Sequence, residues 1–263
     1  MQNTNLCEAK VFFEPLVGVG CKCLSEYAAL GPQIDDQDGE EIRMLTRRHF
    51  IATTTALFSA PLSSPAFANT WPTGSQKAAW DAQVTPENFV LETSNPWGLA
   101  PRFLPQRVEA RDGLVPGDIH VDAVARYLYH IEEGGTAMRY GVAIARGNLY
   151  EPGTYTVRRL VEWPHWTPTQ SMIERDPVNA QWADGMEPGP TNALGSRAIY
   201  LYVGQRDTYL RIHGTPHPRS IGGRASSGCV RMVMAHINAL YPNVEMGSTV
   251  YLYSASDSVL TTS

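Results

Sequence analysis

Near the C-terminus the sequence reads His213-Gly214-Thr215, then Ser220-Ile221-Gly222, then Ser226-Ser227-Gly228-Cys229-Val230-Arg231-Met232. This stretch brings a thiol, an imidazole and a guanidinium into one short segment. A thiol is a strong nucleophile only as the thiolate, and a neighbouring imidazole can accept its proton. The stretch therefore predicts covalent acyl-transfer chemistry, with Cys229 as the nucleophile and His213 as the base.

The residues between the two side chains are typical of a loop that folds back on itself. His213 ends a strand-like run, and prolines and glycines are frequent from there to Cys229. Gly228 allows the backbone to approach a ligand closely. Because a helix is expected after Cys229, the main-chain N–H groups there should face an oxyanion and lower the thiol pKa below about 8.5. Ser226 and Ser227 are expected to cap that helix or to polarise the site.

The fold class follows from short runs of β-branched and aromatic residues that are separated by glycine-bearing breaks. They predict strands at residues 127–131, 139–144, 155–161, 198–203, 209–212 and 249–253, with a hairpin at Gly134-Gly135. A helix is predicted after Cys229 because Val233, Ile237, Leu240 and Tyr241 form an apolar stripe that Pro242 stops. Many strands with one or two short helices predict an all-β sandwich or barrel, and not a parallel α/β sheet.

The composition divides the chain into segments. Residues 69–115 are rich in proline and tryptophan, with a helix candidate at 75–83, and are expected to form an arm packed on the main domain. Residues 116–254 are expected to form the catalytic domain and residues 255–263 a C-terminal tail.

Residues 44–68 have the order of regions found in an export signal. Thr46-Arg47-Arg48-His49-Phe50-Ile51 opens an apolar run, and Ala66-Phe67-Ala68 supplies a signal-peptidase site. We therefore expect a twin-arginine signal that is cleaved after Ala68, and a periplasmic protein. The acidic residues 1–43 are interpreted as an upstream extension of a protein that begins at Met44, with a long leader as the alternative.

Cleavage at that site would leave Cys229 as the only thiol, because Cys7, Cys21 and Cys23 precede it. An exported protein that uses cysteine for structure normally carries pairs, so a single thiol favours a reactive role over a buried structural one. The upstream cysteines lack a fourth ligand, and His217 beside the catalytic pair lacks a carboxylate. No metal is therefore expected.

The overall composition excludes several classes of partner. With 263 residues, 43% of them hydrophobic, the chain has enough apolar material for a packed core. Its net charge is −5 and it has no basic stripe, so a nucleic-acid partner is not expected. No run reaches the roughly 18 apolar residues of a membrane span. We expect a soluble monomer.

The run from His213 to Met232 resembles the signature of the L,D-transpeptidase catalytic domain family, which crosslinks peptidoglycan with a cysteine nucleophile. The likeness covers residues 97–253 and includes the segments 102–105, 163–168 and 189–195 and the hairpin at Gly134-Gly135. The resemblance implies a β-sandwich-like catalytic domain that needs no metal or organic cofactor. It also implies Cys229 as nucleophile and His213 as base.

Roles for the neighbouring residues come from the same resemblance. The Gly214 carbonyl would orient the imidazole, Gly228 would adjoin the oxyanion site, and Arg231 would lie on the substrate side, unless it only braces the loop. Some family members carry histidine where Ser227 stands here, which leaves the auxiliary polar contacts open. The other candidates for substrate contacts are Ser226, Ser227, Thr215, Ser220, Asn192 and Trp163. For Trp163 and its neighbour Trp166 the alternative is core packing, and for Asn192 it is bracing of a turn.

The implied reaction is a two-step transfer on a peptidoglycan stem peptide. Cys229 would attack the carbonyl that precedes the terminal D-alanine, and an acceptor amine would resolve the thioester. The acceptor could be a second stem peptide or a lysine of a wall-anchored lipoprotein. The alternatives are L,D-carboxypeptidase activity, a general cysteine peptidase, and a non-catalytic wall-binding module. A carbapenem adduct on Cys229 would count against the last of these.

Overall fold

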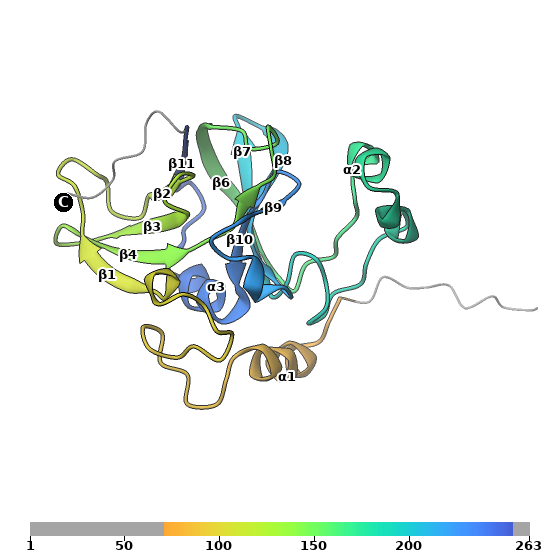
Figure 1. Cartoon of the computed structure of the whole chain (residues 1–263), viewed down its shortest axis with the longest axis horizontal. Coiled ribbons are helices and arrows are strands. Elements are labelled where there is room, and N and C mark those ends of the chain that lie inside the picture. The colour runs from red at the N-terminus through yellow and green to blue at the C-terminus, as the bar shows by residue number, and fades with distance from the viewer. Residues whose placement is uncertain (1–70, 255–263) are drawn as a thin grey trace, which may run out of the picture. The chain divides into compact units, whose positions relative to one another are not determined.

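The computed structural model describes residues 71–254 (Figure 1). The extension, the export signal, the upstream cysteines and the C-terminal tail expected from the sequence lie outside these residues. The α-helices are α1 (Gly74–Val84), α2 (Gln170–Arg175) and α3 (Met234–Leu240), and 3-10 turns cover Pro101–Phe103, Pro177–Trp182, Pro218–Ser220 and Tyr241–Asn243. The strands are β1 (Gln106–Glu109), β2 (Ile119–Asp122), β3 (Tyr127–Glu132), β4 (Thr136–Gly141), β5 (Ile144–Ala145), β6 (Gly153–Glu162), β7 (Arg197–Val203), β8 (Arg206–Thr215), β9 (Arg224–Ser226), β10 (Val230–Val233) and β11 (Thr249–Tyr253).

Nine of these strands form one continuous sheet, in the order β1-β4-β3-β2-β11-β6-β7-β8-β10. Its pairs are antiparallel except for β2 with β11 and β8 with β10, and β5 and β9 form a separate parallel pair. The all-β prediction is confirmed. The sandwich-like character comes from the two halves of a single sheet and not from two separate sheets.

The hydrophobic core joins the two halves of the sheet. One buried cluster contains Val121 of β2 and Leu128 of β3 together with Ile199 of β7, Ile212 of β8 and Leu240 of α3. The sheet therefore curves around a shared core, and α3 lies beneath it in the view of Figure 1. Burial of apolar side chains at this density stabilises the fold by about 25 cal/mol per Å² of apolar surface removed from water.

The strand and hairpin predictions agree with the structure at most positions. Residues 249–253 coincide with β11, and β3 and β4 form the predicted hairpin. The predicted helix at 75–83 is α1, which begins one residue earlier, with the Thr73 side chain accepting from the Gln76 N–H. The short helix α2 was not predicted.

One expectation near the proposed nucleophile is wrong. Cys229 does not precede a helix directly, because Val230–Val233 form β10 and α3 begins only at Met234. The four residues Val230–Val233 take an extended conformation because their backbone groups form hydrogen bonds with β8, along the edge of β8 that does not pair with β7. A helix start is therefore absent from the residues that flank the thiol.

The part of the expected arm that precedes β1 packs on the sheet through a second apolar cluster, whereas residues 106–109 join the sheet itself by pairing with β4. Leu99 and Phe103 of the arm lie against Ile221 and Val233. Phe103 comes so close to the backbone of β4 that a side chain at Gly141 would lie 2.6 Å from it. Within residues 71–254, the helices are all too short or too polar to cross a membrane.

Candidate active site

The parallel pairing of β8 with β10 builds the site. In this register Ile212 faces Val230 and His213 faces Arg231. Side chains alternate between the two faces of a strand, so Ile212 and Val230 enter the core while His213 and Arg231 share the other face. Cys229 immediately precedes β10 and lies on this second face as a diagonal neighbour of His213.

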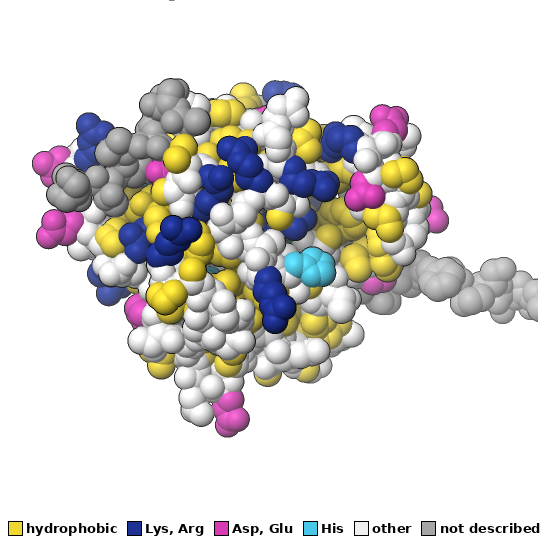
Figure 2. Space-filling view, in the orientation of Figure 1, with side chains coloured by type: hydrophobic (Ala, Val, Ile, Leu, Met, Phe, Trp, Pro, Cys, Tyr) yellow, Lys and Arg dark blue, Asp and Glu magenta, His cyan; other side chains and the backbone are white. Residues whose placement is uncertain are grey.

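Cys229 and His213 open onto the same cavity, of about 360 Å³. The opposite wall belongs to the segment 166–191, which carries α2 (Figure 1). That wall contributes Trp166, Met172, Val178, Trp182 and Met186. Figure 2 shows Lys and Arg side chains gathered over β9 and β10 on this face of the molecule. The cavity thus combines an apolar wall with a cationic one.

His213 is built to be a neutral base. It is only 4% exposed, and its Nδ1 donates to the Gly214 carbonyl oxygen at 2.5 Å. The pKa of His213 is lowered to about 3, mainly by burial and next by the Arg231 guanidinium, while the hydrogen bond to Gly214 opposes the shift. Because Nδ1 carries the proton, the lone pair lies on Nε2, where it is available to accept a proton.

The Cys229 side chain is 8% exposed, and its thiol donates to the Tyr209 carbonyl oxygen at 3.7 Å. Burial raises the pKa of Cys229, against smaller opposing effects of Arg211 and Arg231. The expected lowering of the thiol pKa by a helix start is therefore wrong: the predicted helix forms as α3, but the four residues of β10 separate its start from the thiol. At rest the pair consists of a neutral thiol and a neutral imidazole.

Ser226 and Gly228 shape the turn that presents the thiol. The Ser226 hydroxyl donates to the Cys229 carbonyl at 2.5 Å and accepts from the Gly228 N–H at 3.4 Å. Gly228 has a φ of +144°, which side-chain-bearing residues rarely adopt. Ser226 therefore caps this turn and not a helix, and Ser227 lies on the rim between the cavity and a neighbouring groove at Tyr209.

Arg231 is half-buried on the cavity wall, and within residues 71–254 its side chain has no carboxylate partner. Its Nε is buried without a hydrogen bond. The loop-bracing ion pair considered from the sequence is thus not formed in this part of the chain. Burial lowers the pKa of Arg231, and nearby Arg146 adds to that effect. Arg146 and Arg231 therefore both face the cavity, and neither forms an ion pair with a residue of the described part of the chain.

Three of the predicted substrate contacts lie elsewhere. Trp163 is fully buried, with its ring 5.2 Å from that of Trp80, so it belongs to the core. Asn192 is also fully buried and bonds to the main chain of residues 186, 187 and 194, so it braces its turn. The Ser220 hydroxyl donates to the His217 carbonyl and closes a 3-10 turn outside the cavity wall. Thr215 does line the cavity, where its hydroxyl accepts from the His217 N–H.

Some residues of the site were not predicted from the sequence. Arg146 reaches the cavity because its N–H bonds to the Ser226 carbonyl, a contact between segments 80 residues apart. The Tyr209 carbonyl faces the thiol because that residue has a φ of +59°. Trp166, grouped with Trp163 in the sequence analysis, is the member of that pair that lines the cavity. Among the residues of the described domain, no three His, Cys, Asp or Glu side chains are placed to hold a metal ion.

Comparison with known proteins identifies the family of this chain. The family model for the L,D-transpeptidase catalytic domain matches residues 116–252. A putative L,D-transpeptidase of Fuscovulum blasticum is 34% identical over 131 residues, or 49% of this chain and 65% of that protein. The probable L,D-transpeptidase ErfK/SrfK of Escherichia coli is 29% identical over 152 residues, or 57% of this chain and 47% of that protein. The chain therefore spans less than two thirds of the length of these relatives.

Two solved structures are also similar. A protein from Brucella melitensis whose title reads probable carnitine operon oxidoreductase CaiA is 45% identical, with 59% of this chain and 96% of that chain covered and a TM-score of 0.41. An L,D-transpeptidase from Mycobacterium smegmatis is 16% identical, with 52% and 58% covered and a TM-score of 0.39. The assignment rests on the family model, which covers more than half of the chain and includes both Cys229 and His213. The chain belongs to the L,D-transpeptidase catalytic domain family.

Proposed function

We propose that this protein is a cysteine-dependent L,D-transpeptidase that joins a peptidoglycan stem peptide to an amine acceptor and releases D-alanine. The observation that carries the proposal is the opening of the Cys229 thiol and the neutral His213 imidazole onto one cavity. Acyl transfer needs a nucleophile and a base that can reach the same carbonyl carbon. The family membership supports this reaction class and the peptidoglycan substrate.

The first step forms a thioester. The Cys229 thiol gives its proton to Nε2 of His213 as sulfur attacks the carbonyl before the terminal D-alanine. The resting pair is neutral, so the thiol must lose its proton to His213 for sulfur to act as the nucleophile. The carbon–nitrogen bond then breaks, and the imidazolium returns the proton to the D-alanine amine. In the second step an acceptor amine attacks the thioester and gives a proton to His213. The carbon–sulfur bond then breaks, and the imidazolium returns the proton to the sulfur of Cys229.

The charges around the cavity fit an anionic substrate. Stem peptides carry carboxylates, and a guanidinium binds a carboxylate through two parallel hydrogen bonds. Arg231 and Arg146 line the cavity, and of the lining residues only Asp176 is acidic. A main-chain N–H beside Gly228 would stabilise the oxyanion of the tetrahedral intermediate, which is worth roughly 3 kcal/mol per well-placed donor.

The proposal includes a location and an acceptor. A substrate in the cell wall requires export, for which the pattern at residues 44–68 is the proposed twin-arginine signal. In this proposal the mature protein is a monomer that uses no cofactor. The acceptor is the amine of a second stem peptide, and a lysine of a wall-anchored lipoprotein is the alternative.

The experiment that tests this function is incubation of the protein with purified muropeptides, followed by mass spectrometry. We expect D-alanine release together with a crosslinked product when an acceptor amine is present. Hydrolysed tripeptide as the only product would instead identify an L,D-carboxypeptidase. Cleavage of ordinary L-peptides without action on D-alanine-terminated stems would contradict the assignment to this substrate.

Replacement of Arg231 tests the role of the cationic wall. The Arg231→Gln variant is expected to lower kcat/KM for a stem tetrapeptide about 10-fold to 100-fold, mainly through KM, because a charge-assisted hydrogen bond contributes about 1.5–3 kcal/mol. Steady-state kinetics with the matched control Arg206→Gln, an exposed arginine away from the cavity, would isolate the effect. Equal values of kcat/KM in the two variants would show that Arg231 does not contact the substrate.

A further inference from the structure

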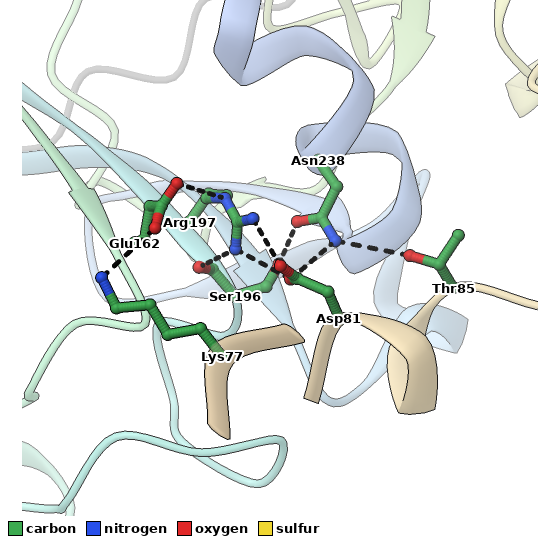
Figure 3. Close-up of polar contacts among 7 residues, drawn as sticks. All are labelled: Lys77, Asp81, Thr85, Glu162, Ser196, Arg197 and Asn238. Atoms are coloured by element: carbon green, nitrogen blue, oxygen red, sulfur yellow. Dashed lines mark hydrogen bonds and ion pairs between the residues drawn. The ribbon is translucent and has the colours of Figure 1, made fainter. Parts of the chain in front are cut away.

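A polar cluster connects the arm to the domain at the start of β7, where Ala198 pairs with His213 of β8. Figure 3 shows its seven residues. All of its arm residues precede the segment matched by the family model, which begins at residue 116. The arm contributes Lys77, Asp81 and Thr85, and the domain contributes Glu162, Ser196, Arg197 and Asn238. The cluster is therefore formed by two parts of the chain far apart in sequence.

The centre of the cluster is a two-pronged ion pair between Asp81 and Arg197. The two guanidinium NH groups donate to the two carboxylate oxygens at 2.9 and 2.8 Å. The Arg197 side chain is 11% exposed, and Glu162 lies farther from it, at 4.0 Å. A guanidinium this far from water needs a counter-charge. The arm supplies that counter-charge through Asp81.

The helix α1 is attached mainly by these polar contacts. None of its residues is buried, so apolar burial does not hold it strongly. Its aromatic contact is Trp80, which packs edge-on against Trp163. The Asn238 amide donates to Asp81 at 3.4 Å and its carbonyl oxygen accepts from the Ser196 hydroxyl at 2.6 Å. The contacts of α1 thus converge on Ser196 and Arg197.

Arg197 also donates to the Ser196 carbonyl at 2.9 Å, and Ser196 with the preceding Gly195 lies against the backbone that holds the base. Gly195 has a φ of +63°, and a side chain there would lie 2.7 Å from the Gly214 carbonyl carbon. In the other direction, a side chain at Gly214 would lie 3.2 Å from the Ser196 nitrogen. The Gly214 carbonyl accepts from Nδ1 of His213. A short series of direct contacts therefore leads from Asp81 to the imidazole.

We propose that Asp81 is a positioning residue: by holding Arg197 and Ser196, it fixes the Gly214 carbonyl and thereby the direction in which His213 presents Nε2. Asp81 itself does not line the cavity and touches no substrate. The arm is in this view part of the catalytic apparatus, although it lies outside the matched family segment. The reaction in which His213 acts is the one given under Proposed function, on which this inference rests.

The test compares Asp81→Asn with Glu87→Gln, which removes the same charge from an exposed position of the arm. For Asp81→Asn we expect kcat for D-alanine release to fall about tenfold with KM within about twofold, because misplacement of a catalytic group slows chemistry more than binding. The rate of Cys229 alkylation by iodoacetamide at neutral pH should fall by a similar factor. Glu87→Gln should leave both rates unchanged.

The outcomes separate positioning from simple stabilisation. Wild-type kcat and alkylation rates in folded Asp81→Asn would overturn the proposal, and so would an activity loss that only tracks the unfolded fraction. If Asp81→Asn does not fold, Arg197→Lys decides in the same way, since it keeps the charge but loses the two-pronged geometry. If the wild-type protein releases no D-alanine, the proposed function fails, and the alkylation ratio still tests the positioning.

Discussion

Replacement of Cys229 by alanine is expected to abolish D-alanine release from a stem tetrapeptide, with a loss of about 10⁴-fold or more in kcat. Cys229 is the one thiol within residues 71–254, and it faces the same cavity as the neutral imidazole. Hydroxyl groups also line the cavity, but a serine or threonine hydroxyl is a much weaker nucleophile than a thiol, so none is expected to replace Cys229. The measurement is a D-alanine assay on purified wild-type and variant protein.

The control for this prediction is a covalent probe. Intact-mass analysis should show a carbapenem adduct on the wild-type protein and none on Cys229→Ala or on Cys229→Ser, which preserves the shape of the site. The melting temperature of Cys229→Ser should stay close to that of the wild type, since serine keeps a side chain of similar shape that can donate to the Tyr209 carbonyl. Full turnover by the alanine variant would rule out the thioester mechanism.

Local pattern was sufficient to predict much of the fold. The alternation at residues 249–253 and the glycines between β3 and β4 specify their strands without help from distant residues. The helix predicted from Val233 is confirmed as α3, but the strand β10 before it was missed. Its four residues pair with the free side of β8, and a sequence pattern does not show that partner.

The two reacting residues of the candidate site could be predicted from the sequence, whereas the residues that surround them could not. Residue type and spacing indicated Cys229 and His213, and the structure brings both to one cavity. The pKa of the thiol was predicted in the wrong direction, because its burial depends on β8 and on the segment that carries α2. The position of Trp163 was also not predictable, because a tryptophan can line a binding groove or pack in the core, and here it is fully buried in the core. The pair of Asp81 and Arg197 spans 116 positions and leaves no local signal.

Replacement of His213 by glutamine is expected to lower kcat/KM by about 10²-fold to 10⁴-fold, the usual contribution of a positioned general base. Glutamine keeps a similar volume but has no group that accepts the thiol proton at neutral pH. The matched control is His165→Gln, which removes an imidazole that pairs with Glu187 outside the cavity and should leave kcat/KM unchanged. Equal activity of the two variants would show that His213 is not the base.

The pH dependence sharpens this prediction, because the pKa of His213 is lowered from 6.5 to about 3. The base is lost only when the folded protein binds a proton, so kcat/KM should show no His213 inflection near pH 6.5 and should fall only toward pH 3. Stability changes in the same window: below pH 6.5 the unfolded chain binds a proton that folded His213 refuses, which costs about 1.4 kcal/mol per pH unit. Denaturant unfolding at pH 7 and pH 4.5 should therefore show a smaller loss of stability in His213→Gln than in the wild type, whereas an equal loss would mean that His213 titrates normally.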